Sequence, residues 1–193
     1  MKRIIFASKN EGKVKEVRKI LSGLNLQILS LNDIDYTVEI EETGSTFEEN
    51  AKIKAEEIYK IYKMPVIADD SGLSVEQLNG EPGVYSARYA GGSATDDENN
   101  LKLLKNLEEF LQPHRAKFVC AAVYCFGTDF FTAIGEVYGE IIKAPRGTNG
   151  FGYDPLFVPS GHNQTMAELD SQIKNRISHR FKAFDQLKIC ISE

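Results

Sequence analysis

The first residues of the chain change from an apolar run to a polar loop and then to a helical pattern. Residues Lys2–Ser8 include the apolar run IIFA, which is typical of a short buried strand. Residues Lys9–Gly12 are polar, and from Lys13 to Ser22 apolar residues recur at helical spacing until Gly23. A strand that leads through a short loop into a helix is the usual opening of an α/β fold.

The next part of the chain continues this alternation. Thr46 is followed three residues later by Glu49, a capping-box pattern that predicts a helix reaching about Tyr62. An apolar strand, Val66–Ala68, follows and is expected to end at Asp69. Two further strands are predicted earlier, at residues 26–31 and 36–40.

The second half of the chain is richer in β-structure. Thr95 or Asp96 begins a helix, and residues 116–126 and 130–142 have the β-branched and aromatic content of a hairpin. A closing helix is expected at about residues 178–189. The order of elements predicts an α/β fold with a mixed central sheet and flanking helices. We expect one domain over residues 1–193, with two lobes around a substrate cleft.

Charge and composition exclude some classes of function. The 23 lysines and arginines against 28 aspartates and glutamates give a net charge of −5, which argues against a non-specific nucleic-acid binder. The first apolar run is too short for a signal peptide, and no run is long enough to span a bilayer, so we expect a cytoplasmic protein. Cys120, Cys125 and Cys190 are expected to be reduced core residues, and His114 and His162 surface residues.

The loop after the first strand is a candidate phosphate site. Ser8, Lys9, Asn10, Glu11, Gly12 and Lys13 place donors and positive charge at the start of a helix, where backbone N–H groups attract anions. The spacing of a Walker A loop is absent. Taken alone, the segment is better explained as an ordinary polar turn between strand and helix.

The adjacent carboxylates Asp69 and Asp70 are a candidate metal or catalytic site. They follow an apolar strand, where α/β sheets tend to bind ligands. Mg²⁺ favours carboxylate oxygens, and Glu42 could add a second carboxylate. Lys54 would be a charge partner for phosphate if its helix face pointed at the ligand. The alternative is a turn that uses Asp and Gly for backbone reasons.

A glycine-rich segment at residues 147–155 is a candidate base-binding loop. Glycines on both sides of Phe151 let a ligand approach the backbone, and a purine could stack on the ring. His179 and Arg180, at the start of the last helix, could donate to base carbonyl oxygens. The alternatives are a simple turn and exposed helix-start residues.

These segments, taken in order along the chain, resemble the inosine triphosphate pyrophosphatase family. The resemblance covers nearly the whole chain and depends on several motifs in register. They are Ser8-Lys9-Asn10-Glu11-Gly12-Lys13, ETGSTFEENA from Glu42, ADDSGL from Ala68, PGVYSAR from Pro82, Gly150-Phe151-Gly152-Tyr153-Asp154-Pro155 and Ile177-Ser178-His179-Arg180.

The resemblance implies a homodimeric, Mg²⁺-dependent hydrolase that converts dITP, ITP or XTP to the nucleoside monophosphate and pyrophosphate. It implies that Glu42 and Asp70 bind the metal and that Asp70 is also the general base. The implied substrate-binding residues are Ser8, Lys9, Asn10, Glu11, Gly12, Lys13, Lys54, Ser71, Phe151, Gly152, Tyr153, Asp154, Lys174, His179 and Arg180.

Two other functions are compatible with these residues. One is a Maf-like pyrophosphatase acting on modified pyrimidine nucleotides, although the Ser-Pro-Arg-Arg run usual in that family's first loop is absent. The other is a nucleotide-binding regulatory module without turnover. The presence of both Glu42 and Asp70 argues against the second alternative, because binding alone needs no paired carboxylates.

Overall fold

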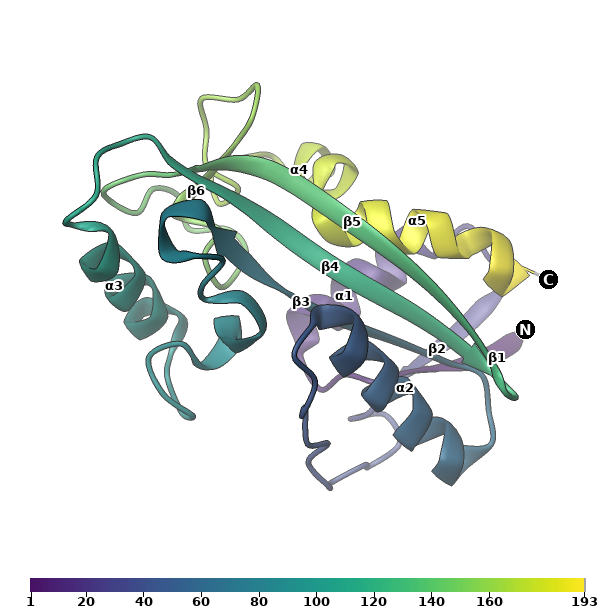
Figure 1. Cartoon of the computed structure of the whole chain (residues 1–193). Helices are drawn as coiled ribbons and strands as arrows, with labels where there is room; N and C mark the ends of the chain where they lie inside the picture. The colour runs from purple at the N-terminus through teal and green to yellow at the C-terminus, as the bar shows by residue number, and fades with distance from the viewer. Residues whose placement is uncertain (193) are drawn as a thin grey trace. The chain divides into compact units, whose positions relative to one another are not determined.

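The computed structural model describes residues 1–192 and contains a six-stranded mixed sheet with flanking helices (Figure 1). The strand order is β2-β1-β3-β4-β5-β6. The strands are β1 (Lys2–Phe6), β2 (Leu26–Ser30), β3 (Val66–Val75), β4 (His114–Phe126), β5 (Asp129–Ile141) and β6 (Phe157–Pro159). The helices are α1 (Glu11–Ile20), α2 (Phe47–Tyr62), α3 (Asp96–Leu107), α4 (Ser171–Ile177) and α5 (His179–Ser192). Short 3₁₀ turns cover Glu76–Leu78 and Gly83–Arg88.

The strand pairing confirms the predicted fold class. β1 pairs in parallel with β2 and with β3, as expected where helices connect the strands. β4 and β5 are long strands joined by the two-residue turn Gly127-Thr128, and β6 pairs antiparallel to the end of β5. The sheet is therefore parallel where helices and strands alternate in sequence and antiparallel where the sequence is β-rich.

The chain divides into two compact units. Unit 1 comprises Met1–Asp70, Cys120–Gly135 and the segment from His179 to the end of the described chain. Unit 2 comprises Ser71–Val119 and Glu136–Ser178. The chain passes from one unit to the other within β3, β4 and β5 and again between α4 and α5.

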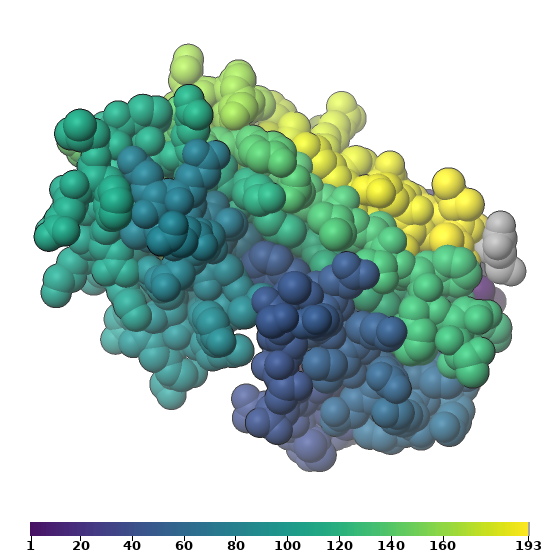
Figure 2. Space-filling model, in the orientation of Figure 1, coloured from purple at the N-terminus to yellow at the C-terminus, as the bar shows by residue number. Residues whose placement is uncertain are grey.

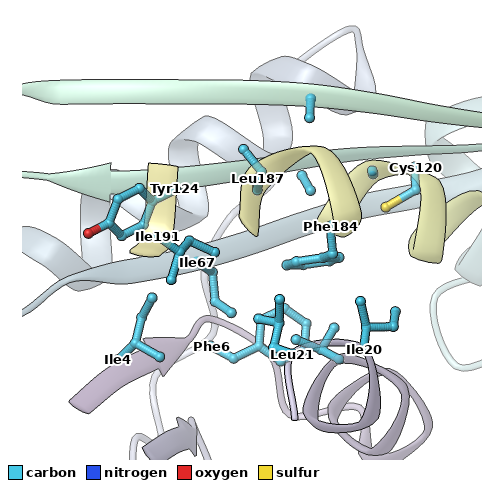
Figure 3. Close-up of a cluster of buried hydrophobic side chains, with 14 of the residues drawn as sticks. Ile4, Phe6, Ile20, Leu21, Ile67, Cys120, Tyr124, Phe184, Leu187 and Ile191 are labelled. Carbon is cyan, nitrogen blue, oxygen red and sulfur yellow. The ribbon is translucent and has the colours of Figure 1, made fainter. Parts of the chain in front are cut away.

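Unit 1 has an apolar cluster on each face of its part of the sheet. On one face, side chains from α1 and α5 pack on β1 and β4, and Phe184 of α5 meets Phe6 edge-on with ring centroids 6.0 Å apart (Figure 3). On the other face, Ala51, Ala55 and Ile58 of α2 pack against the alternate strand residues. The sheet of unit 1 is thus covered by helices on both sides.

The helix α5 lies close against the unit 1 part of β5. Figures 1 and 2 show the two elements side by side, and Gln186 Nε2 donates a hydrogen bond to Ile134 O at 3.0 Å. A Cβ atom at Gly135 would lie 2.1 Å from His179 O, so a side chain there would push the start of α5 away. The glycine allows the approach that places His179 and Arg180 in unit 1.

Unit 2 has its own apolar core. Leu73, Val75 and Phe118 from the strands pack with Leu103 and Leu107 of α3. Tyr153, Leu156 and Met166 from the segment between β5 and α4 complete this core. The glycine-rich loop is therefore attached to a packed cluster at one end.

Several sequence predictions are corrected by the structure. Residues 36–40 form no strand, and residues 171–177 form a helix that was not predicted. The strand that begins at Val66 does not end at Asp69 but continues to Val75. His114 is not a surface residue, because it begins β4, is buried, and contacts Gln77 Oε1 through Nδ1 at 2.7 Å.

Other predictions are confirmed by the local structure. Thr46 and Thr95 are the N-caps of α2 and α3, and each makes the two hydrogen bonds of a capping box. Cys120 and Cys125 are free and buried, as predicted. Cys190 is also free, but it is partly exposed and packs at the edge of the unit 1 core, so the prediction of a core position was wrong for this residue. Among the described residues, no helix combines the length and hydropathy needed to cross a bilayer.

Candidate functional site

The adjacent residues Asp69 and Asp70 lie inside β3 and point to opposite faces of the sheet. Successive side chains of a strand alternate between faces, so the two carboxylates contact different helices. Asp69 contacts Lys13 of α1 and Arg180 of α5, whereas Asp70 contacts Asn50 and Lys54 of α2. The acidic pair of the sequence therefore belongs to two separate polar clusters, both in unit 1.

The cluster on the α2 face, which we call the Asp70 cluster, comprises Glu42, Asn50, Lys54 and Asp70. Lys54 Nζ lies 2.7 Å from Glu42 Oε1 and 3.8 Å from Asp70 Oδ1, so both carboxylates converge on one ammonium group. Asn50 donates to Asp70 Oδ2 at 3.1 Å and accepts the Gly44 N–H at 2.8 Å. Asn50 therefore links the loop that carries Glu42 to the carboxylate of Asp70.

Burial and neighbouring charges shift the pKa values of Asp70 and Lys54 in this cluster. Burial raises the pKa of Asp70, and the negative charge of Glu42 adds to the rise, although Lys54 and Lys13 act in the opposite direction. Burial acts to lower the pKa of Lys54, but the charges of Asp70 and Glu42 outweigh it and raise that pKa. Lys54 thus remains a cation, and Asp70 is a more basic carboxylate than an exposed aspartate.

The cluster on the other face, which we call the Asp69 cluster, comprises Lys13, Glu16, Asp69, Cys120 and Arg180. Arg180 donates through Nε and Nη2 to Asp69 Oδ2, both at 3.1 Å, and through Nη1 to Glu16 Oε2 at 2.5 Å. Lys13 Nζ lies 3.3 Å from the same Asp69 oxygen. The side chain of Arg180 is 1% exposed and that of Asp69 is 0% exposed, so this is a fully buried ion pair.

The buried pair keeps both of its members charged. Burial acts to raise the pKa of Asp69, but Lys13 and Arg180 outweigh it and hold that pKa well below its usual range. Burial acts to lower the pKa of Arg180, and the charges of Asp69 and Glu16 reverse that effect. The Cys120 Sγ lies 3.8 Å from Asp69 Oδ2, and burial raises the pKa of this thiol, which is therefore not a nucleophile.

The loop after β1 is ordered by its own side chains. Asn10 is the N-cap of α1 and accepts the Lys13 N–H at 3.0 Å, and the Ser8 hydroxyl accepts the Asn10 N–H at 3.2 Å. Lys9 donates to the carbonyl oxygens of Thr37 and Val38. The start of α1 thus lies just after the carboxyl end of β1, as a phosphate-binding loop requires.

The remaining residues of this loop, Glu11, Gly12 and Lys13, lie in the first turn of α1. The Glu11 carboxylate accepts a hydrogen bond from Asn32 Nδ2 at 2.5 Å, and Gly12 is half-buried in the first turn of α1. Of the loop cations, Lys13 points into the Asp69 cluster and Lys9 to the chain at residues 37–38.

In unit 2, Phe151, Asp154 and Lys174 form a third polar cluster, the Asp154 cluster. Lys174 Nζ lies 2.7 Å from Asp154 Oδ2 and 5.5 Å from the centroid of the Phe151 ring. Asp154 Oδ2 also accepts the Phe151 N–H at 3.0 Å. A Cβ atom at Gly150 would lie 2.1 Å from Asp154 Oδ2, so only glycine leaves room for this arrangement.

The remaining predicted residues differ in accessibility. Tyr153 is buried in the unit 2 core and donates through its hydroxyl to Ser86 O at 2.9 Å, whereas Phe151 and Gly152 are partly exposed. Ser71 follows Asp70 in β3 and is partly exposed, and His179 is partly exposed at the start of α5.

The structure therefore separates the predicted site residues by unit. Unit 1 contains Ser8, Lys9, Asn10, Glu11, Gly12, Lys13, Glu42, Lys54, Asp70, His179 and Arg180, and unit 2 contains Ser71, Phe151, Gly152, Tyr153, Asp154 and Lys174.

Some residues of these clusters were not found from the sequence. Glu16 stands three residues after Lys13 on α1, a spacing that places them on one face, but nothing in the pattern connects it to Arg180. Asp96 and Asn100 of α3 bind the glycine-rich loop across more than fifty residues of sequence. Only the folded chain brings these residues together.

Glu42 and Asp70 are the candidate metal ligands in the part of the chain that the structure describes. Over residues 1–192, no group of three or more His, Cys, Asp and Glu side chains could hold a metal ion among themselves. The convergent carboxylates of Glu42 and Asp70 are the type and number of ligands that Mg²⁺ commonly takes from a protein, with phosphate and water as the rest.

The chain is similar to known proteins over its full length. Residues 4–190 match the model described as Ham1 family. The dITP/XTP pyrophosphatase of Bacillus licheniformis is 54% identical over 195 residues, which cover 100% of both chains. The HAM1 protein from Coxiella burnetii has a TM-score of 0.91 at 42% identity, covering 100% of this chain and 99% of that one. The Ham1 protein of Staphylococcus aureus has a TM-score of 0.88 at 42% identity, covering 98% of each chain.

Proposed function

The chain belongs to the Ham1 family, and on that premise we propose how its polar clusters divide the work of hydrolysing a nucleoside triphosphate. The activity is that of a dITP/XTP pyrophosphatase, a hydrolase. In this reaction water adds to phosphorus, the bond between the α- and β-phosphates breaks, and the nucleoside monophosphate and pyrophosphate are released.

The observation that carries the proposal is the convergence of two carboxylates on one lysine in the Asp70 cluster. Glu42 and Asp70 would hold Mg²⁺ together, since their oxygens lie 2.7 and 3.8 Å from the same Lys54 nitrogen. When bound there, Mg²⁺ neutralises charge that develops on the phosphate oxygens. Lys54 supplies a further positive charge to the phosphates.

Asp70 is proposed as the general base. In the metal-free cluster, burial raises the pKa of its carboxyl group above that of an exposed aspartate, the direction that favours proton acceptance. The hydrogen bond from Asn50 fixes one of its oxygens, Oδ2, and so orients the carboxylate. Asp69, in contrast, has a pKa held low and is buried among cations, so it is not assigned as a base.

The other predicted residues are proposed to bind the phosphates or the base according to the groups that they offer. The loop from Ser8 to Lys13 offers the start of α1 to the phosphates. Phe151 offers a partly exposed ring to the base, and the cation of Lys174 can donate to a 6-oxo group. Adenine has an amino group at that position, which would face this donor without an acceptor and so be rejected. We also propose that the remaining predicted substrate residues contact the nucleotide, that the protein forms a homodimer, and that it is located in the cytoplasm.

The test is release of pyrophosphate from dITP and XTP, with and without Mg²⁺. Asp70→Asn should lower kcat by at least about 10²-fold, the order expected for loss of a general base. Glu42→Gln should lower the Mg²⁺-dependent rate, because it removes one of the two carboxylates proposed to bind the metal. Glu41→Gln is the matched control, because Glu41 is the exposed neighbour of Glu42. Near-normal turnover of Asp70→Asn would refute the role of Asp70 as general base. Release of orthophosphate instead of pyrophosphate would show that the bond between the α- and β-phosphates is not the one cleaved.

A further inference from the structure

Two side chains of α3 bind the glycine-rich loop and have no part in the proposed chemistry. Asp96 Oδ2 accepts the Gly152 N–H at 2.6 Å, and Asn100 Nδ2 donates to Gly152 O at 3.0 Å. Asp96 and Asn100 are four residues apart and so lie on one face of the helix. Together they bind both backbone polar groups of one residue, and all these residues are in unit 2.

The residue that they bind has an unusually free backbone. Gly152 has a φ of +62°, in the left-handed region, where glycine is favoured because it has no Cβ. Glycine also loses the most conformational entropy on ordering, so fixing its N–H and its carbonyl restricts the loop more than the same bonds would elsewhere. The two hydrogen bonds therefore restrain the backbone next to Phe151.

The residues on either side are held by other contacts. Phe151 N–H is bound by Asp154, and Tyr153 is fixed in the core and by its bond to Ser86 O. The backbone of Gly152 lies between these two fixed points. The bonds from α3 therefore complete the restraint of the segment that presents the Phe151 ring.

The stability of the fold does not by itself explain why an asparagine occupies position 100. Asn100 is buried, and within residues 1–192 its Oδ1 atom has no hydrogen-bond partner. A buried acceptor without a partner destabilises a folded chain, and leucine has a similar size and no such atom. The contribution that asparagine makes at this position is the hydrogen bond to Gly152 O.

We propose that Asp96 and Asn100 are positioning residues that hold Phe151 ready to stack on the purine base. They set the affinity for the nucleoside part of the substrate, while the phosphates are bound by other residues. This inference rests on the function proposed above, in which Phe151 contacts the base.

The experiment compares Asp96→Ala and Asn100→Leu with the control Asp97→Ala. Asp97 is an exposed acidic residue in the same first turn, so its removal alters the charge at the helix start equally. Two competitive inhibitors are the probes: dIMP, which contains the base, and inorganic tripolyphosphate, which does not. Thermal unfolding is measured for every variant.

We expect each α3 variant to raise the Ki of dIMP about fivefold, as for the loss of one hydrogen bond. The KM for dITP should rise by a similar factor with kcat nearly unchanged, because the lost interaction contributes equally to the ground and transition states. The Ki of tripolyphosphate should not change. Asn100→Leu should change Tm little, because it removes the unpaired Oδ1 atom together with the hydrogen bond to the partly exposed Gly152. Asp97→Ala should match the wild type in every inhibition constant.

An unchanged Ki for dIMP, or an equal rise for both inhibitors, would overturn the proposal. Phe151→Ala separates this failure from failure of the proposed function. If Phe151→Ala raises the Ki of dIMP and the α3 variants do not, the role of Asp96 and Asn100 is refuted alone. If Phe151→Ala leaves that Ki unchanged, the stacking role is refuted and the positioning role with it.

Discussion

Replacing Arg180 by leucine should destabilise the protein far more than a surface substitution would. The guanidinium is 1% exposed and binds Asp69 and Glu16, and Asp69 is itself fully buried. Removing one member of a buried ion pair leaves the other charge without compensation and costs about 3–5 kcal/mol. For a chain of this size, about 2–4 °C of Tm is lost per kcal/mol, so the expected fall is about 6–20 °C.

The pH dependence follows from the depressed pKa of Asp69. A carboxyl group whose folded pKa is below its unfolded value contributes stability above the unfolded value, and this contribution is lost as the pH falls through the folded pKa. In Arg180→Leu, the charge of Arg180 no longer lowers the pKa of Asp69, and Lys13 is the main cation left to oppose the effect of burial. The pKa of Asp69 is therefore expected to rise in this variant. Acidification then neutralises Asp69 in the variant first, and the stability difference from wild type should shrink towards low pH.

The assay is urea unfolding of wild type and variants between pH 4 and 8, with Tm measured in parallel. Arg176→Leu is the matched control, since Arg176 is an exposed arginine in α4 close by in sequence. The double variant Arg180→Leu with Asp69→Asn removes both buried charges and should recover part of the loss. A loss below about 1 kcal/mol at pH 7, the size of an exposed pair, would refute the reasoning.

Three other outcomes follow from the structure. Thr46→Ala removes the N-cap hydroxyl of α2 and should lower the free energy of unfolding by about 1 kcal/mol in urea titrations, with an unchanged value contradicting the capping role. Gly150→Ala places a Cβ 2.1 Å from Asp154 Oδ2 and should raise the KM for dITP. Gly161 also has a positive φ, but a Cβ there would meet no atom within 4 Å, so Gly161→Ala should leave the KM unchanged. Equal effects of the two variants would refute the steric argument. Chelation with EDTA should stop pyrophosphate release without lowering Tm, because the charge of Lys54 already compensates the carboxylates of Glu42 and Asp70. A large fall in Tm would instead show that the metal has a structural role.

Local sequence patterns predicted much of the fold because they report short-range physics. The capping box at Thr46, the start of a helix at Thr95, the hairpin of β4 and β5 and the apolar faces of α1 and α2 each depend on residues close together in the chain. The same local reasoning predicts that the strand ends at Asp69, whereas β3 continues through Asp70 to Val75. Charged residues are rare inside buried strands, and only partners on other elements make them tolerable there.

The candidate site shows the same division. The sequence alone determined the types of groups available: two carboxylates with a lysine, a polar loop before a helix, and an aromatic ring among glycines. Tertiary structure decided that Asp69 and Asp70 face opposite sides of the sheet, that Arg180 binds Asp69, and that α3 fixes Gly152. These contacts join residues from 20 to 111 positions apart in the chain, where the pairing depends on how strands and helices pack and not on local conformational preference.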